Sequence, residues 1–147
     1  MGAEPYWYFV PYNPDITEVL EELREREFRA GRYGAALFSL EFPIRPDSPA
    51  PGPEHASIEE AIAEAGEVGT GSILDIQGVA DEPDFLMAGP LDDDTLEDLY
   101  GTTQPTREML EANMAFLEDV DRGMCVYIIV YREGKPDEIL FAGYSFD

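Results

Sequence analysis

Residues 124–147, MCVYIIVYREGKPDEILFAGYSFD, constrain the fold of this chain more than any other segment. Two runs rich in β-branched and aromatic residues flank a turn around Glu133–Pro136, which is the pattern of a β-hairpin. The first run is apolar at successive positions, so both faces of that strand must be covered by other parts of the protein. The hairpin is therefore predicted to lie in the centre of a sheet.

The first part of the chain predicts a strand, a helix, a second strand and a loop. The aromatic run PYWYFVPY (5–12) is bounded by prolines and predicts the first strand. Asp15 and Glu18 have the spacing of a capping box and predict a helix that ends at Gly31. Residues 33–42 predict a second strand, and the five prolines of residues 43–53 predict an extended loop within one domain.

The second part of the chain predicts short elements and one longer helix. Ser57 and Glu60 form another capping-box pattern, which opens a helix that runs to about Ala65. Strands are predicted around Ser72–Val79 and Phe85–Ala88. Two further helices are predicted, one capped by Asp92 and stopped by Gly101, and one continuous over 104–123 with Pro105 in its first turn.

These elements together predict an α+β fold in a single domain spanning residues 1–147. We expect an antiparallel-leaning sheet of about 4–6 strands with the C-terminal hairpin at its centre. About four helices are expected to pack mainly on one face of that sheet.

The net charge limits the partners that this protein can bind. Nine Lys and Arg stand against 32 Asp and Glu, which gives a formal net charge of −23. Such a field repels nucleic acid and anionic membranes, and it favours association with a basic protein. A second interpretation is that the acidity serves solubility or adaptation to a salt-rich cytoplasm.

Cysteine and histidine are too scarce for several classes of site. One cysteine, Cys125, excludes an internal disulfide and indicates a reducing compartment. With His55 as the one histidine, the usual zinc sites lack ligands, and no cofactor is predicted. A thiol enzyme built on Cys125 and His55 is disfavoured, because Cys125 lies in the most apolar strand. No signal peptide or membrane-spanning run is recognisable, so we expect a cytoplasmic protein.

Four of the nine basic residues fall in LREREFRAGRYG (23–34). Acid–base pairs at helical spacing (Glu21–Arg24, Glu22–Arg26, Glu25–Arg29) and the helix dipole account for the first three arginines. Arg32 lies beyond Gly31 and has no such local explanation. We expect its guanidinium to meet a carboxylate of the same chain.

Several groups of residues are candidates for a ligand or a partner. An anion or small-molecule site, with or without enzymatic activity, would use Arg32, Arg107, Thr102, Thr103 and nearby tyrosines. Partner contacts would come from aromatic and acidic side chains, namely Tyr6, Trp7, Tyr8, Tyr12, Asp92, Asp93 and Asp94. The same aromatics also suit a protein core, and the three aspartates also suit a helix N-terminus without binding a metal.

The motifs LREREFRAGRY, SILDI, YGTTQPTRE and ILFAGYSFD, taken together, resemble a family of small, acidic, uncharacterised bacterial proteins. The resemblance covers most of the chain and implies a bacterial cytoplasmic protein. It implies no activity, cofactor or site.

The sequence therefore favours a non-enzymatic interaction protein that occupies a basic surface of another protein, for example as an inhibitor or immunity-like protein. The alternatives are the anion or small-molecule site described above and a function unrelated to the charge. The oligomeric state stays open, because a sheet edge could pair with a second copy.

Overall fold

The computed structural model describes residues 5–33 and 50–144. Five strands form one mixed sheet in the order β1-β5-β4-β3-β2. Strand β1 (Pro5–Pro11) pairs antiparallel with β5 (Lys135–Tyr144), which pairs antiparallel with β4 (Cys125–Arg132). The shorter β3 (Met87–Pro90) and β2 (Gly78–Val79) continue the sheet in parallel. The α+β class and the interior position of the hairpin are confirmed.

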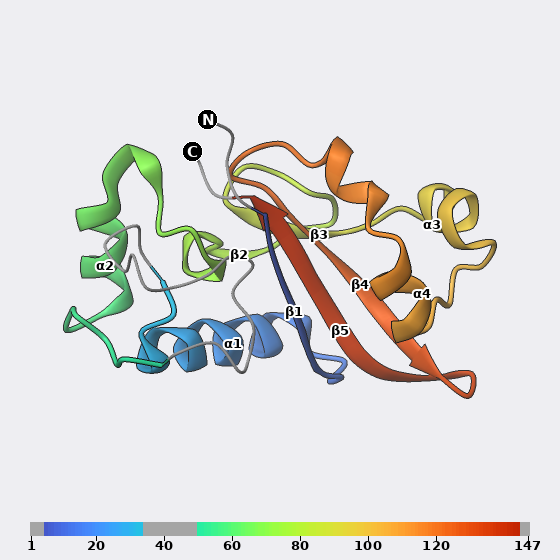
Figure 1. Ribbon diagram of the computed structural model, residues 1–147, viewed down its shortest axis with the longest axis horizontal. Coiled ribbons are helices and arrows are strands. Elements are labelled where there is room, and N and C mark those ends of the chain that lie inside the picture. Colours follow the sequence, from blue (N-terminus) through green and yellow to red (C-terminus); the bar gives the residue numbers. More distant parts are fainter. Residues whose placement is uncertain (1–4, 34–49, 145–147) are drawn as a thin grey trace.

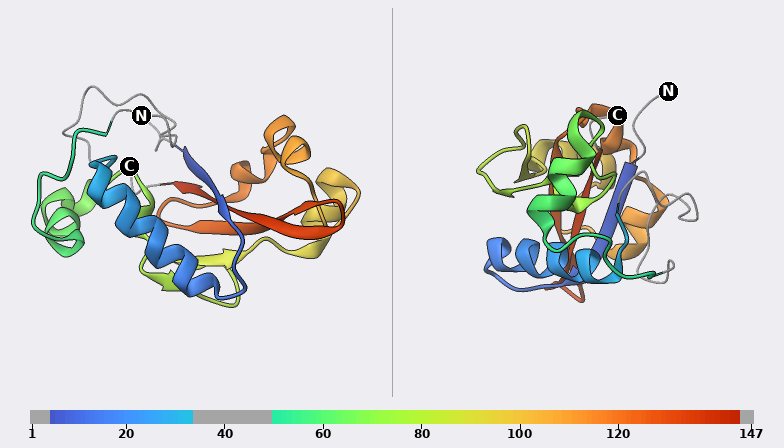
Figure 2. Two further views of the ribbon diagram at one scale, coloured as in Figure 1. Left: turned by 90° about the horizontal axis from the view of Figure 1, so that it is seen from below. Right: turned by 90° about the vertical axis from the view of Figure 1, so that its left-hand side faces the viewer.

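The helices divide between the two faces of the sheet, whereas the sequence placed them mainly on one. Helices α1 (Ile16–Ala30) and α2 (Ile58–Ala65) contribute to a first apolar cluster with Tyr6, Tyr8 and Phe141. Helices α3 (Asp93–Tyr100) and α4 (Arg107–Ala112) contribute to a second cluster with Val126, Ile128 and Leu140. In Figures 1 and 2 the two pairs of helices lie at opposite ends of the strand layer. The physical reason is that β4 and β5 are apolar on both faces, so both faces need cover.

The helix termini follow their predicted signals, with one difference in detail. Asp15 caps α1 by accepting from Glu18 N at 3.1 Å, and Gly31 ends the helix in the left-handed conformation. The reciprocal half of the capping box is absent from the described contacts, because Asp15 N donates to Asn13 Oδ1 instead. Ser57 caps α2 and Asp92 caps α3, as predicted.

Residues 72–79 form a short 3-10 helix, η2 (Ile73–Asp75), and then β2, instead of one strand. Ser72 Oγ accepts from Leu74 N at 3.2 Å, and the buried Asp75 carboxylate accepts from Thr70 N at 2.9 Å. These local bonds satisfy backbone groups that a longer strand would place in the ladder. Strand β3 begins two residues later than expected, because Asp84–Met87 forms a turn.

The long helix predicted over 104–123 is two shorter elements, α4 and the 3-10 helix η3 (Ala115–Asp119). Thr106 caps α4, so Pro105 precedes the helix and does not lie in its first turn as predicted, and Asn113 ends the helix with an extended backbone. The Asn113 side chain accepts from Ala115 N at 2.9 Å, a local bond that competes with helix continuation. The strand predicted at 33–42 and most of the proline-rich loop lie outside the described residues. Within the described part, no helix is both long enough and apolar enough to cross a membrane.

Candidate functional site

The end of α1 holds an ion-pair cluster in which the partly exposed Arg26 joins the buried Glu27 and Arg32. The Glu27 carboxylate is fully buried and accepts from Arg26 Nε at 3.0 Å and from Arg32 Nη2 at 2.9 Å. Arg32 Nε also donates to Glu27 Oε1 at 3.1 Å. These hydrogen bonds outweigh burial and raise the pKa of Arg32 above its usual value. The prediction that Arg32 meets a carboxylate of the same chain is confirmed.

A Schellman-type turn explains why Glu27 is the partner. Gly31 N donates to Phe28 O and Arg32 N donates to Glu27 O, each at 3.0 Å. This pattern reverses the chain through the left-handed Gly31 and returns Arg32 to the last turn of the helix. Helical spacing alone does not pair residues five apart, so the sequence did not identify Glu27.

The other arginines of α1 differ from their predicted pairs in two cases. Arg29 pairs with Glu25 at 2.9 Å, as expected. Arg26 pairs with Glu27 instead of Glu22, and Arg24 donates to Leu74 O in η2 at 2.7 Å. Burial lowers the pKa of Arg24, although it stays far above neutrality as guanidinium groups do. Of the first three arginines, Arg24 therefore serves tertiary packing, whereas Arg26 and Arg29 bond to acids of α1 itself.

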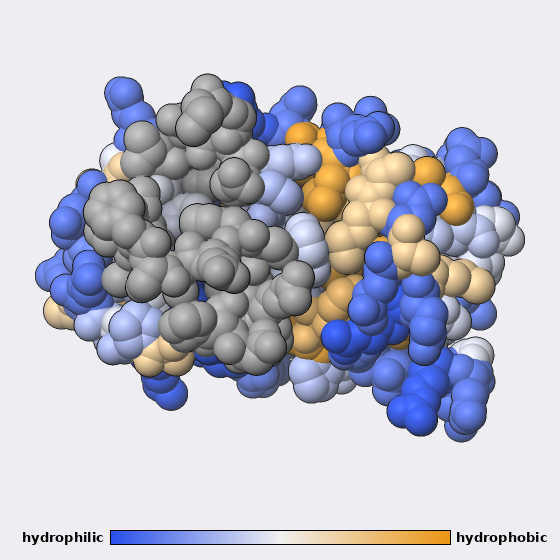
Figure 3. Space-filling model, viewed as in Figure 1, coloured by the Kyte–Doolittle hydropathy of each residue, from blue (hydrophilic) through white to orange (hydrophobic). Residues whose placement is uncertain are grey.

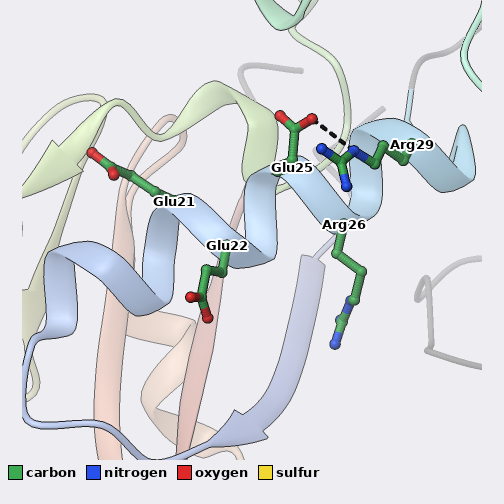
Figure 4. Close-up of a pocket in the computed structure, with 5 residues that line it drawn as sticks. All are labelled: Glu21, Glu22, Glu25, Arg26 and Arg29. Atoms are coloured by element: carbon green, nitrogen blue, oxygen red, sulfur yellow. Dashed lines mark hydrogen bonds and ion pairs between the residues drawn. The ribbon is translucent and has the colours of Figure 1, made fainter.

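An open hollow of about 560 Å³ lies along the outward side of α1. Figure 4 shows that Glu25 and Arg29 face each other there, while Glu22 and Arg26 project on another side of the helix. The described residues that line this hollow are charged, namely Glu21, Glu22, Glu25, Arg26 and Arg29. Such a surface suits contact with another charged surface better than capture of an apolar ligand.

The second candidate arginine, Arg107, lies on the other side of β1 from Arg32. Its guanidinium stacks over the Phe9 ring at 4.2 Å from the centroid and binds Glu111 at 2.8 Å and Glu138 at 2.9 Å. Burial lowers the pKa of Arg107, but the two carboxylates outweigh it and the pKa is raised. Tyr8, which acts electrostatically on Arg32, and Phe9 point to opposite faces of the strand. The structure therefore does not bring the two arginines together.

The two threonines of the predicted anion site lie in the loop before α4. Thr102 is half-buried and its hydroxyl accepts from Gln104 N at 3.0 Å, whereas Thr103 is exposed. A second hollow of about 560 Å³ lies nearby, lined by Thr106, Arg107, Glu108, Val130, Tyr131, Arg132, Glu133, Asp137 and Glu138. Its acids outnumber its bases, so it does not favour an anion.

The predicted partner residues divide into core and surface. Tyr6 and Tyr8 are fully buried in the first apolar cluster, and burial raises the pKa of both hydroxyls. Trp7 and Tyr12 are half-buried. Asp92, Asp93 and Asp94 are exposed, and hydrogen bonds from Thr95 lower the pKa of Asp92. Only part of the predicted contact set is therefore on the surface.

A hydrogen-bonded chain of Tyr33, His55 and Glu64 was not predicted. The Tyr33 hydroxyl lies 2.8 Å from His55 Nδ1 and accepts from Glu54 N at 3.1 Å, and His55 Nε2 bonds the Glu64 carboxylate. These hydrogen bonds join the end of α1 to α2. Because the bonded residues are far apart in sequence, no local spacing predicts the bonds. Cys125 is fully buried and donates to Val126 O, so its partner is not His55. No group of three or more His, Cys, Asp or Glu side chains within 5–33 and 50–144 could hold a metal ion.

Comparisons with protein-family models, with curated proteins and with solved structures give no significant match for this chain. The resemblance to small acidic bacterial proteins stays a prediction. The function is therefore inferred from the geometry and charge of the chain itself.

Proposed function

We propose that this protein is a non-enzymatic interaction module whose acidic surface binds a basic surface of another protein, as an inhibitor or immunity-like protein does. One observation carries the proposal: the described acidic side chains are exposed, with the exceptions of the buried Glu27 and Asp75 and the half-buried Glu25 and Glu138. Ion pairs between described residues engage few of them, namely Glu25, Glu27, Glu64, Glu111 and Glu138. The surface therefore keeps a strong negative field.

The alternative anion site finds less support. Arg32 is 7% exposed and makes two hydrogen bonds to Glu27 through separate nitrogens. Arg107 is bound by two carboxylates on the other side of β1. An incoming anion would have to displace a carboxylate from each arginine, which costs part of the affinity gained.

The proposal places the module in a bacterial cytoplasm. One cysteine in 147 residues supports a reducing compartment. The resemblance of its motifs to small acidic bacterial proteins supports a bacterial source.

The first experiment is a pull-down from a lysate of the source cells at low salt, followed by kinetics with the purified partner. We expect a basic protein at a stoichiometric ratio. Its association rate should fall at least about tenfold when the Debye length shortens from about 30 Å to about 3 Å. Absence of a stoichiometric basic partner, or a rate that does not respond to salt, contradicts the proposal.

A matched variant separates charge from folding. Replacing Asp92, Asp93 and Asp94 by Asn removes three exposed charges, and Asn at position 92 still caps α3. The variant should stay folded, with a small loss of melting temperature because negative charge at the N-terminus of α3 is removed. It should associate more slowly with the basic partner at low salt.

A further inference from the structure

Strand β1 carries aromatic side chains on the sheet face that α3 and α4 cover only in part. Trp7 and Phe9 are half-buried, whereas Tyr6 and Tyr8 on the opposite face are fully buried. In the register of the sheet, Trp7 lies opposite Ala142 and Phe9 lies opposite Leu140, both of which are buried. On this face the helices therefore cover β5 and β4 and leave β1 partly uncovered.

The second apolar cluster explains this limit. Leu96, Leu110 and Phe116 pack against the β4 and β5 side chains, and the aromatic residues of β1 are only partly buried at its border. Tyr144, opposite Pro5 in the register, is also half-buried at this border. Trp7, Phe9 and Tyr144 form what we call the aromatic strip. Figure 3 shows that apolar side chains gather in the middle of this view and that hydrophilic side chains border them; its hydropathy scale colours tryptophan and tyrosine near the middle, so the strip is defined by its residues and not by that colour.

Charged groups stand at both ends of the strip. Near Phe9, Arg107 is held by Glu111 and Glu138, and Glu108 is exposed beside it on α4. At the other end, Tyr144 O accepts from Gly123 N, which follows the exposed Asp121 and Arg122. Acids outnumber bases at this border, so it attracts cationic groups.

The strip has the chemistry of a contact site for cations with apolar stems. Arg107 already stacks over Phe9 at 4.2 Å. Tryptophan is the side chain that binds cations best through its ring face. Among the described residues, no ring pair or stacked cation involves Trp7. Trp7 packs against the second apolar cluster but is only half-buried, so the exposed part of its side chain can contact a Lys or Arg side chain or an apolar group.

We infer that the aromatic strip is the docking surface for the basic partner, and that this partner inserts an amphipathic segment with apolar and cationic side chains. The inference rests on the proposed function. A second copy of the chain is the less favourable occupant, because each copy carries a net charge of −23. Tryptophan in a partly desolvated site is also the residue type that most often dominates an interface.

Two labelled peptides of equal charge, one built from Lys and Leu and one from Lys and Ser, test the inference. Wild type should bind the Lys/Leu peptide at least about tenfold more tightly, since loss of one anchor residue commonly has this effect or more. The Lys/Leu peptide should also shift the emission of Trp7, the one tryptophan of the chain, to shorter wavelength. Unchanged emission on saturation overturns the inference even if no variant folds.

Two variants test whether the preference for the Lys/Leu peptide depends on the aromatic strip. Trp7→Ser should bind both peptides alike, at the level of the Lys/Ser peptide. Phe85→Ser, at an aromatic residue that is 59% exposed outside the strip, should keep the wild-type preference. Thermal melting checks that both variants fold.

The outcomes separate the two proposals. If wild type binds neither peptide at low salt, the proposed function and the docking surface both fail. If it binds both peptides equally, or if Trp7→Ser keeps the preference for Leu, only the docking surface fails. A wild-type dimer that Trp7→Ser dissociates would assign the strip to a second copy and overturn the inference.

Discussion

At the scale of single residues, Glu27 is the group on which the end of α1 depends. Its carboxylate has no exposure and accepts hydrogen bonds from two guanidinium groups, one of which belongs to the buried Arg32. A charge held in this way is costly to leave unpaired, because burial prevents water from replacing the partner. The cluster therefore supports the end of α1.

Glu27→Gln keeps the shape of the side chain and removes its charge, so it tests this role. We expect the free energy of unfolding to fall by about 3–5 kcal/mol, as when one partner of a buried pair is removed. Urea denaturation measures the change. Glu25→Gln is the control, because the Glu25–Arg29 pair is exposed and its loss should cost no more than about 0.5 kcal/mol. Equal losses in the two variants would contradict the assigned role.

Burial raises the pKa of the Cys125 thiol to about 12. The native protein should therefore react with a thiol reagent at pH 8 only when it opens, and the reaction should become fast in urea. The thiol of the unfolded chain ionises near the ordinary value of 9.0, so the native state holds this proton more tightly than the unfolded state. The contribution of the protonated thiol to the free energy of unfolding is therefore fully present below pH 9.0. It is then lost as pH rises from 9.0 toward about 12. Rapid labelling of the native protein at pH 8 would show that Cys125 is accessible.

At the scale of elements, two glycines that end helices separate backbone strain from packing. Gly31 and Gly101 both have left-handed φ angles, +74° and +72°. A Cβ at Gly31 would lie 2.1 Å from Gly52 O, whereas nothing lies within 4 Å of a Cβ at Gly101. Gly31 thus combines a helix stop with a close contact to the segment that precedes α2.

Gly101→Ala should cost about 1 kcal/mol, from the left-handed conformation alone. Gly31→Ala should cost about 1–3 kcal/mol more, because overpacking adds to the same strain. Chemical denaturation of the two variants side by side gives the difference. Similar costs would mean that the 50–53 segment moves away from α1 without penalty.

Elements that depend on regular apolar spacing were predictable, and those that depend on polar side chains were not. The hairpin, β1 and α1 follow from periodicity and from caps, which are local. The break at Asn113 and the turn at Ser72–Asp75 depend on side-chain bonds to backbone that compete with regular structure. The residue types at these positions are compatible both with a continuous helix or strand and with a local turn.

At the scale of the whole molecule, the described acids lie on α1, α2, α3 and α4 and on several loops, and so are not confined to one surface. This distribution also supports the reading that acidity serves solubility or salt adaptation. The partner-binding function and the salt adaptation predict different effects of salt on stability. Salt screens the repulsion between acids almost completely once the Debye length is a few ångströms, so screening alone gives no further stabilisation at higher salt.

The melting temperature measured at increasing KCl concentration distinguishes a partner-binding role of the charge from salt adaptation. If the charge serves a partner, the melting temperature should rise while salt screens self-repulsion, and then level off below about 1 M, where the Debye length is about 3 Å. A melting temperature that continues to rise through molar KCl would favour salt adaptation over the proposed function. Sodium chloride at equal ionic strength controls for the identity of the cation.

The sequence by itself determined the α+β class, the interior hairpin, the caps of α1, α2 and α3 and the net charge, because each follows from residue type and short-range spacing. Only the tertiary structure decided that Glu27 is the partner of Arg32 and that Tyr33, His55 and Glu64 form a chain. It also decided that Tyr6 and Tyr8 are core residues while Trp7 and Phe9 reach the surface. Alternation separates these pairs onto two faces, but which face is covered depends on where distant helices pack.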